Sequence, residues 1–179
     1  QGACRDISAR RQAQGALLDS EAAYRAIFDQ SPNAMAVSRL TGEYVDFNRR
    51  FMEEQALPRA EILGKPSLEI GTIDAEQDEA MAKEFRRLGG KLDHYEARGW
   101  SSGKGEWHDV LISASVIPVK GESMVLTVID NVTERRKAEQ SLRASEERNR
   151  LLVENANEGI AVVQDGLFKF VNPKFLKLT

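Results

Sequence analysis

The sequence contains a long internal repeat. Residues 131–162 resemble residues 6–37, which lie 125 positions earlier, and Leu142 aligns with Leu17 at that spacing. After a one-residue deletion, residues 171–175 (VNPKF) align with 47–51 (FNRRF) at a spacing of 124. Solenoid repeats have periods of roughly 20 to 50 residues, so this longer period indicates repeated whole domains.

The repeat predicts that the chain is a piece of a longer array with one complete unit in its middle. The expected parts are the tail of a preceding domain (1–8), a linker helix (9–28), a complete domain (25–133), a second linker helix (134–153) and the truncated start of a following domain (154–179). The middle unit has a common domain size.

Composition excludes several partners. The net charge of −3 comes from 28 acidic and 25 basic residues mixed along the chain, so we expect neither nucleic-acid binding nor membrane contact by this fragment. Cys4 is the single cysteine, which excludes an internal disulfide and a thiolate metal cluster, and we predict no metal site. No run of 18 apolar residues is present. We expect a cytoplasmic location, with any membrane anchor elsewhere in the parent protein.

Both linkers carry a weak heptad pattern. Positions spaced three and four residues apart form one seam along each predicted helix. The seam residues are Leu17, Tyr24, Ile27, Ala138, Leu142, Asn149 and Leu152. Because Ala, Ser and Asn alternate with the larger apolar residues, a paired helix here would be marginal. A dimeric coiled coil is the first interpretation, and a solvated single helix between two domains stays open. Ser8 and Thr133 are the predicted N-caps of the two helices.

The middle unit predicts an α+β domain. Two short strands (34–40 and 44–48) are followed by helices at 49–55, 59–63 and 74–88 and then by three period-two strands at 94–100, 107–119 and 124–131. This order predicts an antiparallel sheet of about five strands with short helices on one face, flanked by long linker helices.

Five features in this order resemble one family. They are Asn48 with Phe51 three residues later, ILGK at 62–65, Tyr95-Glu96 at the third strand, Gly105 before the fourth, and NVTER at 131–135. Asn172 and Phe175 repeat the first feature. The middle unit therefore resembles a PAS domain of the S-box type, which occurs in tandem in bacterial multidomain sensor proteins. The resemblance implies the PAS fold and a sensory role.

The end of the last strand departs from the family pattern. The family usually closes it with Asp-Ile-Thr, whereas this unit has Asn131-Val132-Thr133. An Asn accepts a hydrogen bond but cannot make the charged contact of a carboxylate. The resemblance implies signal relay through Asp130, Asn131, Thr133 and Glu134.

Catalysis and cofactors are not predicted for this fragment. Walker, Rossmann and zinc spacings are absent from the sequence, and no catalytic residue is assigned. His94 and His108 are interpreted as partly exposed strand positions. The resemblance disfavours haem, because haem-binding relatives commonly carry the axial His on the long helix and residues 74–88 contain no His. It also disfavours flavin, because flavin-binding relatives need a Cys in a short helix of the domain and the single thiol, Cys4, lies outside it.

The family pocket between sheet and helices either holds a small molecule or is filled by side chains. The predicted lining residues are Met35, Val37, Phe51, Ile70, Ile73, Met81, Phe85, Tyr95, Trp107, Ile112 and Met124. A plain apolar core is the alternative interpretation of this set. Tyr95 and Trp107 would orient a ligand, because apolar pockets take their specificity from a few polar groups.

The leading functional hypothesis is a non-catalytic relay module in a signal-transduction protein. A ligand, or the state of a neighbouring PAS domain, would change the geometry of the linker helices in a homodimer. A histidine kinase of a two-component system is the favoured output domain, and a diguanylate cyclase is the alternative. The competing hypothesis is a ligand-free PAS domain that acts as a dimerisation spacer.

Overall fold

The computed structural model describes residues 2–177; the side chains of residues 2–13 and of Leu17 lie outside the described part. The chain divides into two compact units, Gln1–Val132 and Thr133–Thr179. The predicted seam residue Leu17 therefore lies outside the described side chains, as does Cys4. The two units are described separately below.

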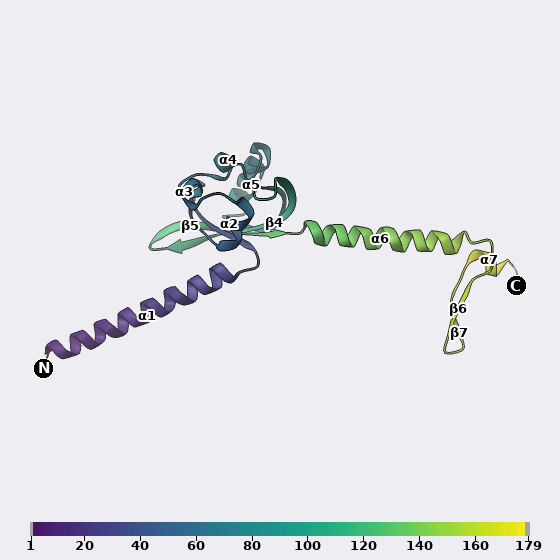
Figure 1. Cartoon of the computed structure of the whole chain (residues 1–179), viewed down its shortest axis with the longest axis horizontal. Coiled ribbons are helices and arrows are strands. Elements are labelled where there is room, and N and C mark those ends of the chain that lie inside the picture. Colours follow the sequence, from purple (N-terminus) through teal and green to yellow (C-terminus); the bar gives the residue numbers. More distant parts are fainter. Residues whose placement is uncertain (1, 178–179) are drawn as a thin grey trace. The chain divides into compact units, whose positions relative to one another are not determined.

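A five-stranded antiparallel sheet forms the centre of the first unit, as the sequence predicts (Figure 1). The strand order is β2-β1-β5-β4-β3. The strands are β1 (Ala34–Arg39), β2 (Tyr44–Phe47), β3 (Lys91–Ser101), β4 (Glu106–Val119) and β5 (Glu122–Asn131). The β4–β5 connection is a two-residue turn in which Lys120 and Gly121 have φ angles of 51° and 85°, a conformation that suits the twist of paired strands.

Four helices cover one face of this sheet (Figure 1). They are α2 (Arg49–Gln55), α3 (Arg59–Ile62), α4 (Ser67–Ile70) and α5 (Ala75–Arg87). The sequence pattern predicts α2, α3 and α5 but not α4. The Asp74 side chain accepts a hydrogen bond from the Gln77 backbone N–H at 2.9 Å and so caps the N-terminus of α5.

The main core lies between the helices and the sheet. Ala34 and Ala36 on β1 are buried against Phe47, Phe51 and Ile62. The two alanines are small, so the helical layer can approach the strands closely, and the aromatic rings of Phe47 and Phe51 lie 5.4 Å apart.

Helix α1 (Gly2–Gln30) packs its C-terminal end against the unit. Phe28 is buried in a second cluster with Val37 and Met124. Because side chains alternate along β1, Val37 points to the face that Phe28 of α1 covers, and Ala36 points to the face that helices α2 to α5 cover. Because α1 begins at Gly2, Ser8 lies inside the helix, and the prediction that Ser8 is an N-cap is wrong.

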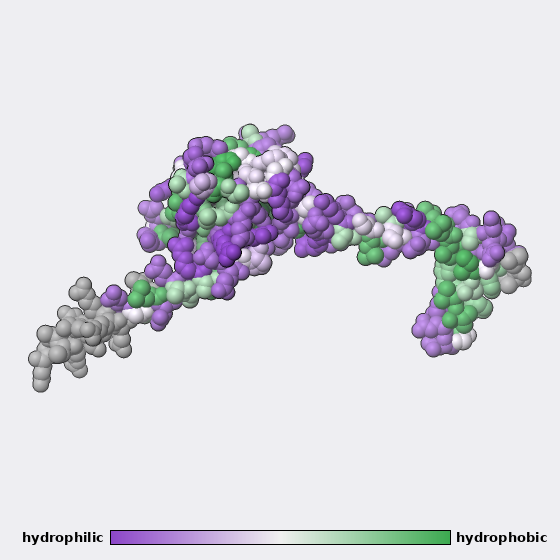
Figure 2. Space-filling model, viewed as in Figure 1, coloured by the Kyte–Doolittle hydropathy of each residue, from purple (hydrophilic) through white to green (hydrophobic). Residues whose placement is uncertain are grey.

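The second unit is a long helix followed by a hairpin. Helix α6 (Thr133–Glu154) leads to β6 (Ala161–Gln164), β7 (Leu167–Val171) and the short helix α7 (Pro173–Leu176). Thr133 is the first helical residue and not the residue before it, so its predicted N-cap position is one residue off. Figure 2 shows hydrophobic residues gathered on the hairpin, where Val163, Leu167 and Phe168 are exposed.

Helices α1 and α6 present polar and charged residues around isolated apolar ones. Over residues 2–177, neither these nor any other helix combines the length and the apolar character that crossing a bilayer requires.

Candidate ligand-binding site

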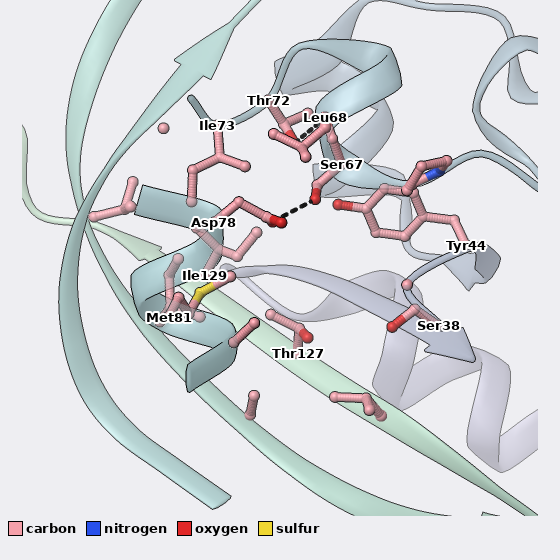
Figure 3. A pocket seen from close by; sticks show the side chains of 18 of the residues that line it. Ser38, Tyr44, Ser67, Leu68, Thr72, Ile73, Asp78, Met81, Thr127 and Ile129 are labelled. Atoms are coloured by element: carbon pink, nitrogen blue, oxygen red, sulfur yellow. Dashed lines mark hydrogen bonds between the residues drawn. The ribbon is translucent and has the colours of Figure 1, made fainter. Parts of the chain in front are cut away.

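A cavity of about 430 Å³ lies between the sheet and helices α2, α4 and α5 (Figure 3). Its volume falls in the range of small-molecule sites, roughly 300–1,000 Å³. Much of the apolar wall comes from α2, α5, β3, β4, β5 and the loop that precedes α5. These residues are Phe51, Ile73, Met81, Phe85, Leu92, Val110, Ile112, Ala114 and Ile129.

One polar group of the wall joins α4 to α5. The Ser67 hydroxyl donates a hydrogen bond to Asp78 Oδ1 at 2.9 Å, and the Thr72 hydroxyl donates to the Ser67 carbonyl at 3.2 Å. Figure 3 shows the Tyr44 hydroxyl directed toward Ser67. Burial raises the pKa of Tyr44 to about 12, against a smaller opposing effect of its hydrogen bond with Thr72. Tyr44 therefore keeps its proton at neutral pH.

A second polar group contains Gln55 on α2 and His108 on β4. Both side chains are buried and line the cavity. Gln55 Nε2 donates to the Trp100 carbonyl at 3.3 Å, whereas Gln55 Oε1 and His108 Nε2 have no hydrogen-bond partner among the described residues. Both atoms have essentially no accessible surface, so they lie in the packing behind the cavity surface and do not face its space.

The end of α2 is held by the loop between β3 and β4. The Glu54 carbonyl accepts hydrogen bonds from the Ser101 hydroxyl at 2.7 Å and from the Gly103 N–H at 3.0 Å. Burial raises the pKa of the Glu54 carboxyl, although the nearby Arg50 acts in the opposite direction. These contacts fix the side of the cavity on which Gln55 lies.

Asn48 joins helix α1 to the sheet and to α2. Its side-chain amide donates to the carbonyls of Phe28 (3.0 Å) and Asn33 (2.9 Å). Its side-chain oxygen accepts from the backbone N–H groups of Met35 (2.9 Å) and Phe51 (3.0 Å). The side chain is fully buried, so all of its hydrogen-bonding capacity is used inside the protein.

Asp46 adds a second link between α1 and the sheet. Its carboxylate contacts Arg25 of α1 at 3.2 Å and Arg59 of α3 at 2.5 Å. The guanidinium of Arg59 also lies over the Phe47 ring, 4.6 Å from its centre. The incoming helix α1 is therefore connected through Asp46 to α3 of the helical layer.

The structure brings some of the predicted pocket residues together and separates others. Phe51, Ile73, Met81, Phe85 and Ile112 line the cavity. The other six are not part of its lining, and their predicted placement is wrong: Met35, Val37, Ile70, Tyr95, Trp107 and Met124.

Their positions explain the difference. Met35, Val37 and Met124 belong to the opposite face, which is covered by Phe28. Ile70 packs against the cluster around Phe51, and Trp107 is 38% exposed. Tyr95 follows an irregularity in the β3–β4 register that begins at Leu92.

The relay and histidine predictions have mixed outcomes. Asn131 lines the cavity, and Glu134 forms a 3.0 Å ion pair with Lys137. The relay roles of all four residues, Asp130, Asn131, Thr133 and Glu134, stay predictions. His94 is exposed as expected, but His108 is buried, so its assignment as a partly exposed position is wrong.

Sequence reasoning missed most of the polar lining. Gln55, Ser67, Thr72, Asp78 and His108 all line the cavity without having been selected. One signal was available for His108, because it lies in period-two spacing with the buried residues Val110, Ile112 and Ala114.

The strand order, the helical layer on one face and the cavity between them define the first unit as a PAS fold. Residues 22–53 and 147–179 each match the family model of the PAS domain. No curated protein sequence matches the chain.

Solved PAS domains are similar in structure. The PAS domain of an HTR-like protein from Haloarcula marismortui is 20% identical, with a TM-score of 0.54, over 68% of this chain and 98% of that one. A domain of a sensory box sensor histidine kinase/response regulator from Geobacter sulfurreducens is 24% identical, with a TM-score of 0.51, over 64% and 96%. A PAS domain from a two-component sensor histidine kinase is 14% identical, with a TM-score of 0.52, over 65% and 98%.

Proposed function

We propose that this chain is a sensory and relay module of a multidomain signalling protein. The observation that carries the proposal is the cavity of about 430 Å³ inside the PAS fold, whose largely apolar wall also contains polar side chains such as Ser67, Thr72 and Asp78. A filled core would not leave a space of this size, because protein interiors are otherwise close-packed. A small molecule in the cavity is therefore the proposed input.

The proposed output leaves through β5. Ile129 and Asn131 at the end of this strand line the cavity, and helix α6 begins two residues later at Thr133. The Val132 N–H donates to the Asp109 carbonyl at 2.9 Å, which holds the end of β5 against β4. A ligand that moves the end of β5 would therefore change the start of α6. The ligand shifts the equilibrium between two arrangements of the junction between β5 and α6 only to the extent that it binds them with different affinity.

We also propose that the chain comes from a tandem array of PAS domains. The same family model matches both segments, and Asn172 repeats the hydrogen bonds of Asn48, donating to Val153 and Glu158 and accepting from Ile160 and Phe175. Helix α6 would then be the exit helix of one domain and the entry helix of the next, as α1 is for the first unit.

The proposed assembly is a homodimer through the linker helices. The described seam residues are exposed in the single chain; Ile27 is 75%, Leu142 60% and Leu152 65% exposed. A second copy would bury these apolar side chains in a shared seam. Because the seam is weak, small changes at its ends could alter its register.

Two of the similar solved structures are domains of sensor histidine kinases. We propose a histidine kinase as the output of the parent protein, with a diguanylate cyclase as the second choice and a cytoplasmic location for this module. The module itself would bind and relay and would not catalyse a reaction.

The test separates this function from that of a ligand-free dimerisation spacer. The purified chain is denatured, and released small molecules are identified by mass spectrometry; the refolded protein is then screened for a rise in melting temperature across a metabolite panel. A molecule bound at one per chain supports the sensory proposal. No released molecule and no shift in melting temperature would support the spacer.

A further inference from the structure

The polar group between α4 and α5 indicates which end group a ligand of the cavity carries. This inference rests on the proposed function and concerns the class of molecule that the cavity binds. Tyr44, Ser67, Thr72 and Asp78 all line the cavity, and Figure 3 shows the Asp78 carboxylate and the Tyr44 hydroxyl directed toward Ser67.

The hydroxyl hydrogens of this polar group are already used inside the protein. The Ser67 hydroxyl donates to Asp78 Oδ1 at 2.9 Å, and the Thr72 hydroxyl donates to the Ser67 backbone carbonyl at 3.2 Å. Tyr44 is also hydrogen-bonded to Thr72. Because the single hydrogen of the Thr72 hydroxyl goes to the carbonyl, Tyr44 is the donor in its bond with Thr72. The group therefore has acceptors left for a ligand, but no hydroxyl hydrogen.

Asp78 adds a negative charge to these acceptors. Burial raises the pKa of Tyr44 most, and the charge of Asp78 raises it further, so this charge acts on the neighbouring wall. Asp78 Oδ2 has no hydrogen-bond partner among the described residues. It is nevertheless not one of the fully buried unpartnered atoms, so it keeps accessible surface. A ligand in the cavity can therefore reach this carboxylate.

Three arginines also line the cavity, but each is engaged or exposed elsewhere. Arg39 forms a 3.5 Å ion pair with Glu122. The guanidinium of Arg98 lies over the Trp107 ring, 5.7 Å from its centre. Arg86 is exposed in the last turn of α5. The positive charges of the lining therefore do not neutralise the polar group between α4 and α5.

The two carboxylates of the cavity wall differ in their partners. Glu54 forms an ion pair with Arg50 at 3.2 Å. Asp78 is bonded to the neutral Ser67 hydroxyl and forms no ion pair with any described residue. Charges attract more strongly beside apolar groups than in bulk water, so a cation from outside the protein would be bound well here.

We propose that the cavity binds a molecule with a primary ammonium group on an apolar body. The ammonium donates a charge-assisted hydrogen bond to the Asp78 carboxylate, which has acceptor capacity left beside its bond from Ser67. The apolar body packs against Ile73, Met81 and other apolar side chains of the wall.

Other end groups fit this wall less well. A neutral alcohol can donate one hydrogen bond but has no charge to pair with Asp78. A carboxylate has no hydrogen for the acceptors of the polar group and is repelled by the negative charge of Asp78. The expected order of affinity is therefore amine, alcohol, acid.

The test measures the binding of three probes by isothermal titration calorimetry at neutral pH. The purified chain is first unfolded and refolded to remove any bound small molecule. The probes share a phenyl ring on a three-carbon chain and differ in the end group: phenylpropylamine, phenylpropanol and phenylpropionate. We expect the amine to bind about tenfold more tightly than the alcohol, because a charge-assisted hydrogen bond is stronger than a neutral one. The acid should bind more weakly than the alcohol.

One substitution assigns the preference to Asp78. Asp78→Asn removes the charge, keeps the size of the side chain and leaves an oxygen that accepts from Ser67. The amine should then bind about tenfold more weakly and match the alcohol, whose own affinity should change little. Glu79→Gln removes the same charge from the next, exposed residue of α5 and should keep the wild-type order.

The wild-type measurement decides the proposal even if Asp78→Asn fails to fold. Equal binding of amine and alcohol, tighter binding of the acid, or binding of none of the three probes would overturn the ammonium ligand. A preference for the amine that persists in Asp78→Asn would overturn it as well. The sensory function is judged separately by the molecule released from the purified chain, and it survives if that molecule has no amine.

Discussion

Asn48 and Asn172 make the same set of four side-chain hydrogen bonds in the two units of the chain. Each donates to one carbonyl at the end of the preceding helix (Phe28 or Val153) and to one in the following loop (Asn33 or Glu158). Each accepts from a backbone N–H at or just before the start of the next strand (Met35 or Ile160) and from the N–H of the residue three positions later. Both side chains are fully buried. A single Asn thus joins the incoming helix, the first strand and the following helix in each repeat.

Replacing Asn48 should destabilise the first unit strongly. Asn48→Ala leaves the N–H groups of Met35 and Phe51 and two carbonyls without their partner, and we expect a loss of about 3 kcal/mol in the free energy of unfolding. Chemical denaturation of the purified chain measures this. The matched variant Asn172→Ala should leave that transition unchanged, because it lies in the other compact unit. A loss below about 1 kcal/mol for Asn48→Ala would show that the network contributes little.

Gly103 lies too close to α2 for a side chain. A Cβ at this position would be 3.0 Å from the carbonyl oxygens of Glu53 and Glu54. Gly103→Ala should therefore lower the free energy of unfolding by about 1–3 kcal/mol. As a control, Gly15→Ala in helix α1 has open space around it and should stabilise that helix by up to about 1 kcal/mol. Unchanged stability of Gly103→Ala would contradict the close approach of the loop to α2.

Tyr44 should ionise at a higher pH than an unperturbed tyrosine. Burial raises its pKa from 10 to about 12. Because the folded pKa lies above the unfolded one, the stability that protonated Tyr44 provides is complete below pH 10 and is lost as the pH rises through about 12. A spectrophotometric titration of phenolate absorbance should show a final phase near pH 12 that disappears in Tyr44→Phe and persists in Tyr24→Phe. A final phase near pH 12 that survives in Tyr44→Phe would contradict the burial of Tyr44 in the cavity wall.

A charge placed in the linker seam should weaken dimerisation. Leu142 is 60% exposed in the single chain, and burying Asp at this position in a paired helix would be unfavourable. Leu142→Asp should weaken dimerisation at least tenfold in sedimentation velocity experiments. Gln140→Asp, on the opposite side of the same helix, should have little effect. An unchanged dimer in Leu142→Asp would contradict the heptad assignment.

The fold could be predicted from the sequence because its local signals agree with one another. The period-two pattern predicts the strands near 107–119 and 124–131, the helical stretches predict helices at 49–55 and 74–88, and the structure contains each of these elements. The long helices likewise follow from sequence, apart from the start of α1.

The lining of the cavity could be predicted only in part. Both faces of β1 are covered, one by α2 to α5 and the other by Phe28 of α1, so alternation separates Ala36 from Val37 but does not say which face borders the cavity. Choosing the larger apolar residues of β1, Met35 and Val37, therefore placed the predicted lining on the face opposite the cavity. Gln55 and Asp78 are ordinary helix residues in the sequence, and only the packing of their helices against the sheet places them in the wall.

The most direct test of the relay is the effect of the cavity ligand on pairing of the linker helices. The dimer dissociation constant is measured by sedimentation for the ligand-free protein and for the protein saturated with the small molecule recovered from it. The account predicts a change of threefold or more, because a ligand that alters β5 and the start of α6 must be coupled to dimerisation. Identical dissociation constants with and without ligand would contradict it.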